Sequence, residues 1–433
     1  MTLASWEGVA SAARVWATAR APRAGDVPLV LYRDANAWCP FCHRVWFWME
    51  QKGLRYETQR IHLGGDPREP PKQPWYLREV APRGNVPALR IGGDEVVLES
   101  LDILDRLDAE FPGHELAADD SFKQKMLQTS GAFDTDCDRW LHNTHAPDEA
   151  ALRGEALQKL TWLEEALRQH GGPFFLGAEP SIVDAAFVGF LTRLAVNYKF
   201  FKGLDVHEVG SAWPRLSAWL RAVERTPGGR ATKQDVAFEQ RIYQAHPLRR
   251  AAAEPCMQLH PTRLGVGEPS DWRAALPSPP VAALQPGGEP ALEAAWRLCE
   301  RRTAVAGFLQ RTRQEAALVA AGAPRAQPDH HWKARRGSGP WKGPAPSSTA
   351  GAEVAEAAEE RAATERHLCA VAAVLTGLQP AAEAARHAGG PAAIRSGPVA
   401  ALGSLVGTPR DMSVAAAAQL RAALASLTGE EAG

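Results

Sequence analysis

The sequence predicts an α/β unit, followed by an all-helical unit and then by an Ala-rich helical extension. Strand and helix patterns alternate up to about residue 115, and only helical patterns follow. The composition then changes: of the 32 Trp, Tyr and Phe residues, 27 precede residue 245, whereas 48 of the last 189 residues are Ala. Because aromatic side chains supply much of the apolar area of a core, we expect a dense core before residue 245 and little to pack with after it.

The overall composition is that of a globular protein without a charge bias. A chain of 433 residues is too long for one core, and at roughly 150 residues per domain we expect two to three domains. Lys plus Arg (49) nearly balances Asp plus Glu (50), which gives no argument for nucleic acid or for acidic substrates. Six cysteines make no disulfide scaffold and fit a reducing compartment. No apolar run approaches the ~18 residues of a membrane span, so we expect no membrane partner.

In the first unit the apolar pattern changes from strand to helix and back. It predicts a buried strand over residues 28–33, a helix over residues 40–52 that ends at Gly53, and a strand over residues 56–61. The remaining elements are a short helix over 72–80, two strands over 85–91 and 95–98 joined by a glycine pair, and a helix over 100–111. The order is therefore β-α-β-α-β-β-α.

Beyond residue 115 the apolar spacing is helical throughout. The predicted helices cover residues 119–142, 148–170, 181–196 and 211–225. The third begins with Ser181 and Asp184 in a capping-box pattern, in which each side chain satisfies a backbone N–H of the first turn.

The extension contains helical patterns between segments rich in Pro, Gly and Ser. Helices are expected near residues 290–320, 353–378 and 409–427. In the last of them, Thr408 is the predicted N-cap and Pro409 the first helical residue. The intervening segments 245–286 and 322–350 are predicted to be disordered linkers.

The start of the chain carries apolar residues at helical spacing, among them Trp6, Val9 and Trp16, and few acids. It is predicted to be an N-terminal helix, with a targeting segment as the alternative. The expected segments are 1–27 for this helix, 28–115 for the α/β domain, 116–244 for the helical domain and 245–433 for the extension.

The chemistry is indicated by the sequence Cys39-Pro-Phe-Cys42, which lies where a strand is followed by a helix. A cysteine at a helix N-terminus faces unpaired backbone N–H groups and the positive end of the helix dipole, and both stabilise a thiolate. Cys42, one turn later, is expected to be buried more deeply and to be able to resolve a mixed disulfide. A single C-x-x-C also occurs by chance or as half of a zinc site, but no second C-x-x-C or C-x-x-H completes one. The setting therefore favours redox chemistry.

Two later dipeptides extend this pattern. Val86-Pro87 begins a strand, where a cis proline would direct the Val86 backbone toward a bound peptide. Glu99-Ser100 opens the next helix, whose N–H groups and Ser hydroxyl can hold a carboxylate. Alone, Glu99-Ser100 is better explained as an ordinary helix start; the three elements in this order are much harder to obtain by chance.

Together these motifs resemble the glutathione transferase superfamily over roughly residues 28–240. The cysteine at the active position is similar to the omega, lambda and dehydroascorbate-reductase-like branches. The resemblance implies a thioredoxin-like α/β domain that holds glutathione and an all-α glutathione-transferase C-terminal domain. It also implies that Cys39 forms a mixed disulfide with glutathione. Cys42 departs from the family, because many such members have Ala or Ser there, and the sequence leaves a monothiol and a dithiol cycle open. The extension more weakly resembles long plant and algal proteins of this type.

The resemblance also assigns the contacts to glutathione as cosubstrate. The Val86 backbone pairs with the glutathione cysteine, and Pro87 is the cis-proline. Glu99 and Ser100 bind the γ-glutamyl end, and Lys72, which follows an insertion at residues 64–71, lies near the glycyl carboxylate. The expected glutathione-binding residues are thus Phe41, Lys72, Val86, Pro87, Glu99 and Ser100.

Other polar clusters have simpler explanations. Asp138, His142 and His145 share one helical face, but a polar helix lining a cleft is favoured over a metal site, and no metal is expected. The stretch from Asp329 to His331 lies in a Gly- and Pro-rich segment, where a solvated linker is favoured. His43, beside Cys42, either modulates the thiol or lies exposed on the helix.

The resulting hypothesis is a glutathione-dependent thiol transferase or reductase that acts through a Cys39–glutathione mixed disulfide. Its acceptors are oxidised or electrophilic small molecules such as dehydroascorbate, or glutathionylated proteins. The alternatives are a non-catalytic interaction or redox-sensing module and glutathione conjugation of electrophiles. The protein is expected to be cytoplasmic, alternatively chloroplastic, and a monomer or homodimer.

Overall fold

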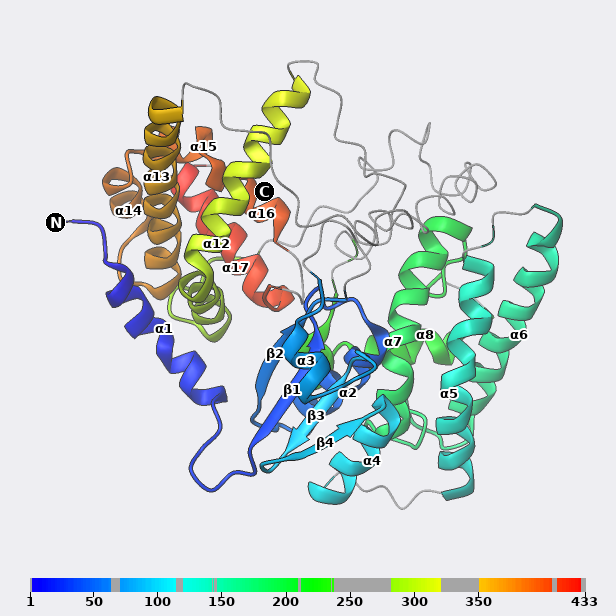
Figure 1. Ribbon diagram of the computed structural model, residues 1–433. Coiled ribbons are helices and arrows are strands. Elements are labelled where there is room, and N and C mark those ends of the chain that lie inside the picture. Colours follow the sequence, from blue (N-terminus) through cyan, green and yellow to red (C-terminus); the bar gives the residue numbers. More distant parts are fainter. Residues whose placement is uncertain are drawn as a thin grey trace. The chain divides into compact units, whose positions relative to one another are not determined.

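The computed structural model describes residues 2–63, 71–113, 120–141, 143, 146–208, 212–234, 236, 282–320, 350–406 and 411–429. The chain forms two compact units (Figure 1). One comprises residues 21–278 with 408–410, and the other comprises residues 1–20, 279–407 and 411–433. Each unit has a hydrophobic core of its own.

The larger unit contains a four-stranded sheet whose strands follow the predicted pattern. The strands are β1 (Leu29–Asp34), β2 (Glu57–Ile61), β3 (Ala88–Ile91) and β4 (Glu95–Leu98). Their order is β2-β1-β3-β4, with β1 parallel to β2 and antiparallel to β3, and β3 antiparallel to β4. Leu31 pairs with Leu89 at the centre, where both side chains are fully buried. The parallel pair is the consequence of the helix that connects β1 to β2.

Three helices accompany the sheet: α2 (Pro40–Gln51), α3 (Pro74–Glu79) and α4 (Ser100–Glu110). This confirms the predicted α/β order. Val45, Trp48 and Met49 are fully buried on α2, as their spacing predicts, whereas Phe41 is 38% exposed. The Phe41 ring lies in the first turn of α2 and packs edge-on against Phe190, with the ring centroids 5.2 Å apart.

The second half of the larger unit is helical, as predicted. Its long helices are α5 (Asp120–Leu141), α6 (Glu149–Arg168), α7 (Ile182–Asn197) and α8 (Pro214–Val223). A 3₁₀ turn, η1 (Ala146–Asp148), precedes α6, and a π-helical turn, η2 (Tyr198–Lys202), follows α7. A short helix, α9 (Pro227–Thr232), was not predicted, although Thr226 caps it through a hydrogen bond from the Gly229 N–H at 2.9 Å.

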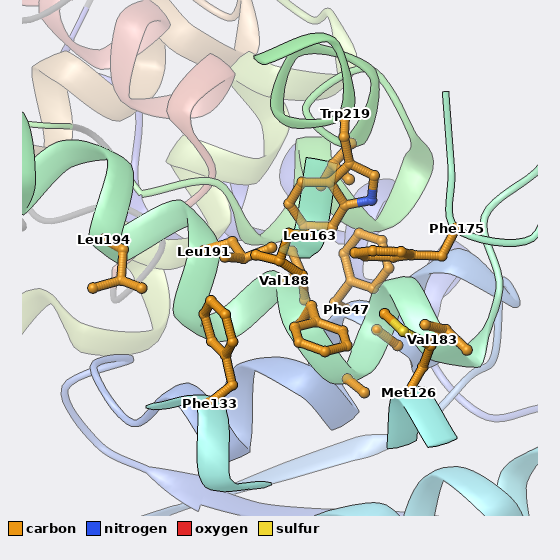
Figure 2. Close-up of a cluster of buried hydrophobic side chains, with 14 of the residues drawn as sticks. Phe47, Met126, Phe133, Leu163, Phe175, Val183, Val188, Leu191, Leu194 and Trp219 are labelled. Carbon is orange, nitrogen blue, oxygen red and sulfur yellow. The ribbon is translucent and has the colours of Figure 1, made fainter. Parts of the chain in front are cut away.

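Helix α7 is the centre of this core. Figure 2 shows Phe47 of α2, Phe133 of α5 and Trp219 of α8 gathered around Val188 of α7. All four side chains are at most 1% exposed. A helix that is apolar on every side is expected to lie inside a protein, and α7 does.

Asp184 fixes the start of α7. Its carboxylate accepts from the Ser181 N–H at 2.8 Å, as the capping-box pattern predicts, and from the Ser181 hydroxyl at 2.7 Å. It also accepts from the Phe175 N–H at 3.2 Å and from Trp219 Nε1 at 2.7 Å. A fully buried carboxylate is costly unless hydrogen bonds compensate it, and these four donors do so.

The smaller unit is a helical bundle that joins the two ends of the chain. Its elements are α1 (Trp6–Arg20), α12 (Glu289–Ala320), α13 (Ala350–Thr376), α14 (Ala381–His387), α15 (Pro391–Ser396), η4 (Pro398–Ala401), α16 (Leu402–Leu405) and α17 (Val414–Thr428). Helix α1 packs against α12 and α13, with Val9 and Ala13 fully buried. The predicted linkers lie almost entirely outside the described residues.

Two expectations for the extension are wrong. The first is that it has little to pack with: residues such as Ala291, Ala372 and Ala417 are fully buried beside Leu and Val in one cluster. Small side chains let helix backbones approach closely, so few aromatics are needed. The second is the start of the last helix. Helix α17 begins at Val414, and its N-cap is Ser413, whose hydroxyl accepts from the Ala416 N–H, rather than Thr408.

Among the described helices, none combines the length and the apolar character that crossing a bilayer requires.

Candidate functional site

Cys39 is the N-cap of α2, as the strand–helix pattern predicts. Its Sγ accepts a hydrogen bond from the Cys42 N–H at 3.4 Å, and Pro40 occupies the first turn, where a missing N–H has no cost. The side chain is partly exposed. Cys39 is thus an accessible thiol aligned with the positive end of the helix dipole.

Cys42 lies one turn further on and is 1% exposed. Burial, together with the neighbouring Cys39 and Asp34, raises the pKa of its thiol well above the ordinary value. The Asp34 N–H faces its Sγ at 3.5 Å. The predicted difference in depth between the two cysteines is therefore present: one thiol is accessible, and the other is buried directly behind it.

The two cysteines line a small pocket, which we call the Cys39 pocket. Its walls are formed by Asp34, Ala37, Cys39, Cys42, His43, Trp46 and Thr232. The carboxylate of Asp34 is fully buried: Oδ2 accepts from the Trp38 N–H at 2.6 Å, whereas Oδ1 has no hydrogen-bond partner among the described residues. No sequence motif singled out Asp34; its position as the last residue of the strand before the Cys39 loop was the available signal.

The neighbours of His43 hold its imidazole in one neutral tautomer. The Arg193 guanidinium, which can only donate, lies 3.0 Å from Nδ1, so this nitrogen accepts and Nε2 carries the proton. Nε2 donates to Thr232 Oγ1 at 2.9 Å, and that hydroxyl donates to the Gly228 carbonyl. Burial, Arg193 and Arg33 hold the pKa of His43 well below its usual value. His43 is 6% exposed, so the alternative of an exposed histidine is wrong.

Arg193 of α7 also holds the loop that ends at Cys39. Its Nε donates to the Trp38 carbonyl at 3.0 Å and its Nη2 to the Ala37 carbonyl at 3.4 Å. Gln234 Nε2 donates to the same Ala37 carbonyl at 2.9 Å. Sequence reasoning missed Arg193 and Gln234, because no local pattern marks a side chain that acts on a loop more than 150 residues earlier.

Val86 and Pro87 lie beside the cysteine. The Val86–Pro87 peptide bond is cis, as predicted. The Val86 carbonyl oxygen is 4.0 Å from Cys39 Sγ, which brings the backbone of this turn next to the thiol. Pro87 is buried and Val86 is partly exposed, so one end of the turn is fixed while the other remains accessible.

Lys72 is the third predicted residue near the cysteines. Its Nζ donates to the Gly84 carbonyl at 2.5 Å. Burial lowers the pKa of the ammonium group. The hydrogen bond to Gly84 places this group beside the turn that leads to Val86. The insertion at residues 64–70 lies outside the described residues.

Glu99 and Ser100 form the N-terminus of α4. Glu99 is exposed, with φ at 63°, and Ser100 is 7% exposed. The Ser100 hydroxyl accepts from Arg44 Nη1 at 3.2 Å, and Arg44 also donates to the Ala186 and Ser130 carbonyls. This buried arginine therefore links Ser100 to α2 and to the helical half of the unit.

The remaining polar clusters lie outside the described part. The side chains of Asp138, His142 and His145, and the segment around Asp329, are among the residues that the structure does not describe. Within the described residues, no group of three or more His, Cys, Asp or Glu side chains is arranged to hold a metal ion.

Comparisons with known proteins give matches in sequence and in structure. Family models for the "Glutathione S-transferase, N-terminal domain" and "C-terminal domain" match residues 38–110 and 146–222. "Protein IN2-1 homolog B" of Oryza sativa and "Glutathione S-transferase L3" of Arabidopsis thaliana are each 31% identical over 201 residues, which is 46% of this chain and 78% and 79% of theirs. The solved dehydroascorbate reductase of Chlamydomonas reinhardtii has a TM-score of 0.42 at 21% identity, covering 50% of this chain and 98% of its own. The chain belongs to the glutathione S-transferase family, whose cosubstrate is glutathione.

Proposed function

We propose that this protein is a glutathione-dependent thiol transferase and reductase that acts through a mixed disulfide on Cys39. The observation that carries the proposal is the position of Cys39 Sγ, which receives the Cys42 N–H at the start of α2 and lies 4.0 Å from the Val86 carbonyl. Glutathione is a peptide thiol. A sulfur nucleophile at this point can react with its sulfur, and the accessible backbone of Val86 can pair with its peptide.

The first step is attack by the Cys39 thiolate on the glutathione sulfur of a disulfide R–S–SG. The Cys39–SG bond forms as the R–S bond breaks, and R–S⁻ leaves and takes a proton. A second glutathione thiolate then attacks the bound glutathione sulfur, which releases glutathione disulfide and restores Cys39. Cys42 offers a second route, in which it attacks Cys39 and displaces glutathione. Glutathionylated proteins are proposed to enter this cycle directly.

Dehydroascorbate, the proposed small-molecule acceptor, has no disulfide: the Cys39 thiolate would add to one of its carbonyl carbons, and a glutathione thiolate would then attack Cys39 Sγ. The Cys39–SG bond forms as the Cys39–carbon bond breaks, the released electron pair and two protons give ascorbate, and a second glutathione restores Cys39.

Glutathione is proposed to lie along the residues around Cys39. The Val86 backbone would pair with its cysteine, and Lys72 would face its glycyl carboxylate, since its ammonium group is held at the Gly84 carbonyl, two residues before Val86. Ser100 and Glu99 would hold the γ-glutamyl end at the N-terminus of α4, where N–H groups favour a carboxylate. Phe41 would offer its exposed ring beside the thiol.

The test compares Cys39→Ser with Cys42→Ser and with Cys299→Ser, a matched control in the bundle. Each variant is assayed for reduction of a glutathionylated peptide and of dehydroascorbate, and for a glutathione adduct by mass spectrometry. We expect Cys39→Ser to lose turnover and adduct together, and Cys299→Ser to behave as the wild type. Full turnover by Cys39→Ser would rule out this mechanism.

A docking role is the second candidate, and the helical bundle favours it. This bundle lies beyond both matched family domains and has a complete core of its own. A protein that binds immobilised glutathione but reduces no disulfide would support docking. Activity with aryl halides in place of disulfides would support conjugation of electrophiles.

The site of action is proposed to be the cytoplasm, with the chloroplast as the alternative. A relative in Arabidopsis thaliana, 29% identical, is named "Glutathione S-transferase L2, chloroplastic". Fractionation of cells that express the full chain with a C-terminal tag separates the two.

A further inference from the structure

Asp34 is a buried carboxylate with an unused oxygen next to the two cysteines. It ends β1, is 0% exposed and lines the Cys39 pocket. Oδ2 is engaged by the Trp38 N–H, but Oδ1 has no donor among the described residues. Leaving a buried carboxylate oxygen without a donor is costly, so such an atom in a reactive pocket calls for an explanation in function.

Cys42 is the thiol that needs a proton acceptor. It is fully buried behind Cys39, and the Asp34 N–H contacts its Sγ. Burial raises the pKa of Cys42 well above the ordinary value, so the thiol keeps its proton at neutral pH. Only the thiolate attacks a disulfide, and solvent has no direct access to this sulfur.

The other titratable groups around the pocket are engaged elsewhere. His43 accepts from Arg193 and donates to Thr232, so neither nitrogen is free. Arg33 donates to the Asp34 carbonyl at 2.9 Å and stacks on Trp46, and Lys72 donates to Gly84. The Tyr76 hydroxyl donates to the Asn85 carbonyl at 2.6 Å. Among the described lining residues, Asp34 is the one base with an open atom.

We propose that Asp34 is the proton acceptor for Cys42 in the step that resolves the Cys39–glutathione disulfide. Oδ1 takes the proton from the Cys42 thiol, and the thiolate attacks Cys39 Sγ. The Cys39–Cys42 bond forms and the Cys39–SG bond breaks, so the dithiol is oxidised while the bound glutathione is reduced. Glutathione leaves as a thiolate and receives the proton from Asp34. This inference rests on the proposed function and assigns it a dithiol route.

The experiment uses the full-length protein and a single turnover. The reduced protein is mixed with one equivalent of a glutathionylated peptide by rapid quench, and release of the peptide thiol, which reports loading, and then of glutathione is followed without added thiol. The variants are Asp34→Asn, which keeps an oxygen for the Trp38 N–H, and Asp94→Asn, an exposed control in the hairpin. Cys42→Ser is included as the variant that lacks the resolving thiol.

We expect Asp34→Asn to load at the wild-type rate and to release glutathione about 100-fold more slowly, as for loss of a general base. Asp94→Asn should match the wild type, and Cys42→Ser should not release. Wild-type release by Asp34→Asn would overturn the inference, as would equal slowing of loading and release, which indicates a structural role. Failure of Cys42→Ser, which cannot resolve the adduct internally, to form the Cys39–glutathione disulfide would overturn both the proposed function and this inference.

The wild type provides a second test if Asp34→Asn does not fold. With an internal acceptor, the release rate should be nearly constant between pH 6 and pH 8. A release rate that instead rises in proportion to hydroxide concentration would show that solvent deprotonates Cys42, and would overturn the role of Asp34.

Discussion

The Arg193 guanidinium donates from Nε to the carbonyl oxygen of Trp38 at 3.0 Å, so α7 holds the residue directly before Cys39. The preceding residue, Ala37, has φ at 56°, a left-handed conformation that costs a residue with a Cβ roughly 1–2 kcal/mol. Arg193 and Gln234 both bind its carbonyl. The conformation of the Cys39 loop thus depends on side chains from the helical half of the unit.

Replacement of Arg193 should slow the reaction at Cys39, although no residue that lines the Cys39 pocket is removed. Arg193→Lys keeps the charge but lacks the fork that reaches the Trp38 and Ala37 carbonyls together. We expect glutathionyl transfer to slow by roughly 10- to 100-fold, because a small misplacement of a reacting atom has effects of that size. Stopped-flow kinetics should show a fall in kcat with little change in KM for glutathione. Arg139→Lys, an exposed control on α5, should have wild-type kinetics, and equal loss in both variants would contradict the positioning role.

Gly189 lets α7 approach α2, the helix that Cys39 caps. A Cβ on Gly189 would lie 2.2 Å from the Pro40 carbonyl oxygen and 2.9 Å from its carbonyl carbon, and both are backbone atoms. Gly189→Ala should therefore lower the free energy of unfolding by about 1–3 kcal/mol and shift the N-terminus of α2. Urea unfolding measures the first effect, and the alkylation rate of Cys39 the second.

The matched control is Gly131→Ala on α5, where an added Cβ meets no atom within 4 Å. Because Gly131 is an exposed helical glycine, its replacement by Ala should raise the free energy of unfolding by about 0.5–1 kcal/mol. If Gly189→Ala is as stable as Gly131→Ala, then α7 and α2 are not in close contact in solution.

His43 should make the protein sensitive to mild acid. Its pKa is held well below 6.5 in the folded state by burial and by Arg193, so below pH 6.5 the unfolded chain binds a proton that the native state does not. Stability is then lost as pH falls, by about 1.4 kcal/mol between pH 7.5 and pH 5.5 from this residue. In His43→Gln, the difference in unfolding free energy between these two pH values should shrink by that amount. An unchanged difference would mean that His43 is solvated.

The cysteines should differ in their reactivity toward iodoacetamide. Cys39 is partly exposed, whereas burial raises the pKa of Cys299 and of Cys369 to about 11. At pH 7.5 a thiol with that pKa has a thiolate fraction about 300-fold smaller than that of a free cysteine with pKa ~8.5. Among the four cysteines that the structure describes, peptide mass spectrometry should find Cys39 labelled first and Cys42 labelled only after unfolding. Early labelling of Cys42 would contradict its burial.

Local patterns were sufficient to predict the sheet, α2 and the cysteine pair, because a strand, a cap and a C-x-x-C are each defined by neighbours in sequence. They did not predict how distant parts act on these elements. The Phe41 ring turns to Phe190 of α7, and Arg193 and Gln234 act on a loop 155 and 197 residues earlier. No spacing rule marks such contacts.

The start of α17 shows the same limit. Thr408-Pro409 and Ser413 both fit the pattern of a helix start, and Ser413 is the N-cap. The choice is made by Glu293 of α12, whose carboxylate accepts from the Ser413 N–H at 2.9 Å and from its hydroxyl at 2.7 Å. A tertiary partner therefore decides between two local signals of similar strength.

Helix α1 should stabilise the bundle rather than the Cys39 pocket. Val9 is fully buried in the bundle core, whereas Val15, on the same helix, is 67% exposed. Val9→Ala should cost about 1–3 kcal/mol through lost burial and a residual cavity, and Val15→Ala should be neutral or slightly stabilising, because Ala is the better helix former. Limited proteolysis should cleave the bundle of Val9→Ala faster, while retention on immobilised glutathione stays at the wild-type level in both variants. Equal proteolysis of the two variants would mean that α1 does not belong to the bundle core. Loss of glutathione retention in Val9→Ala would mean that the site depends on the bundle.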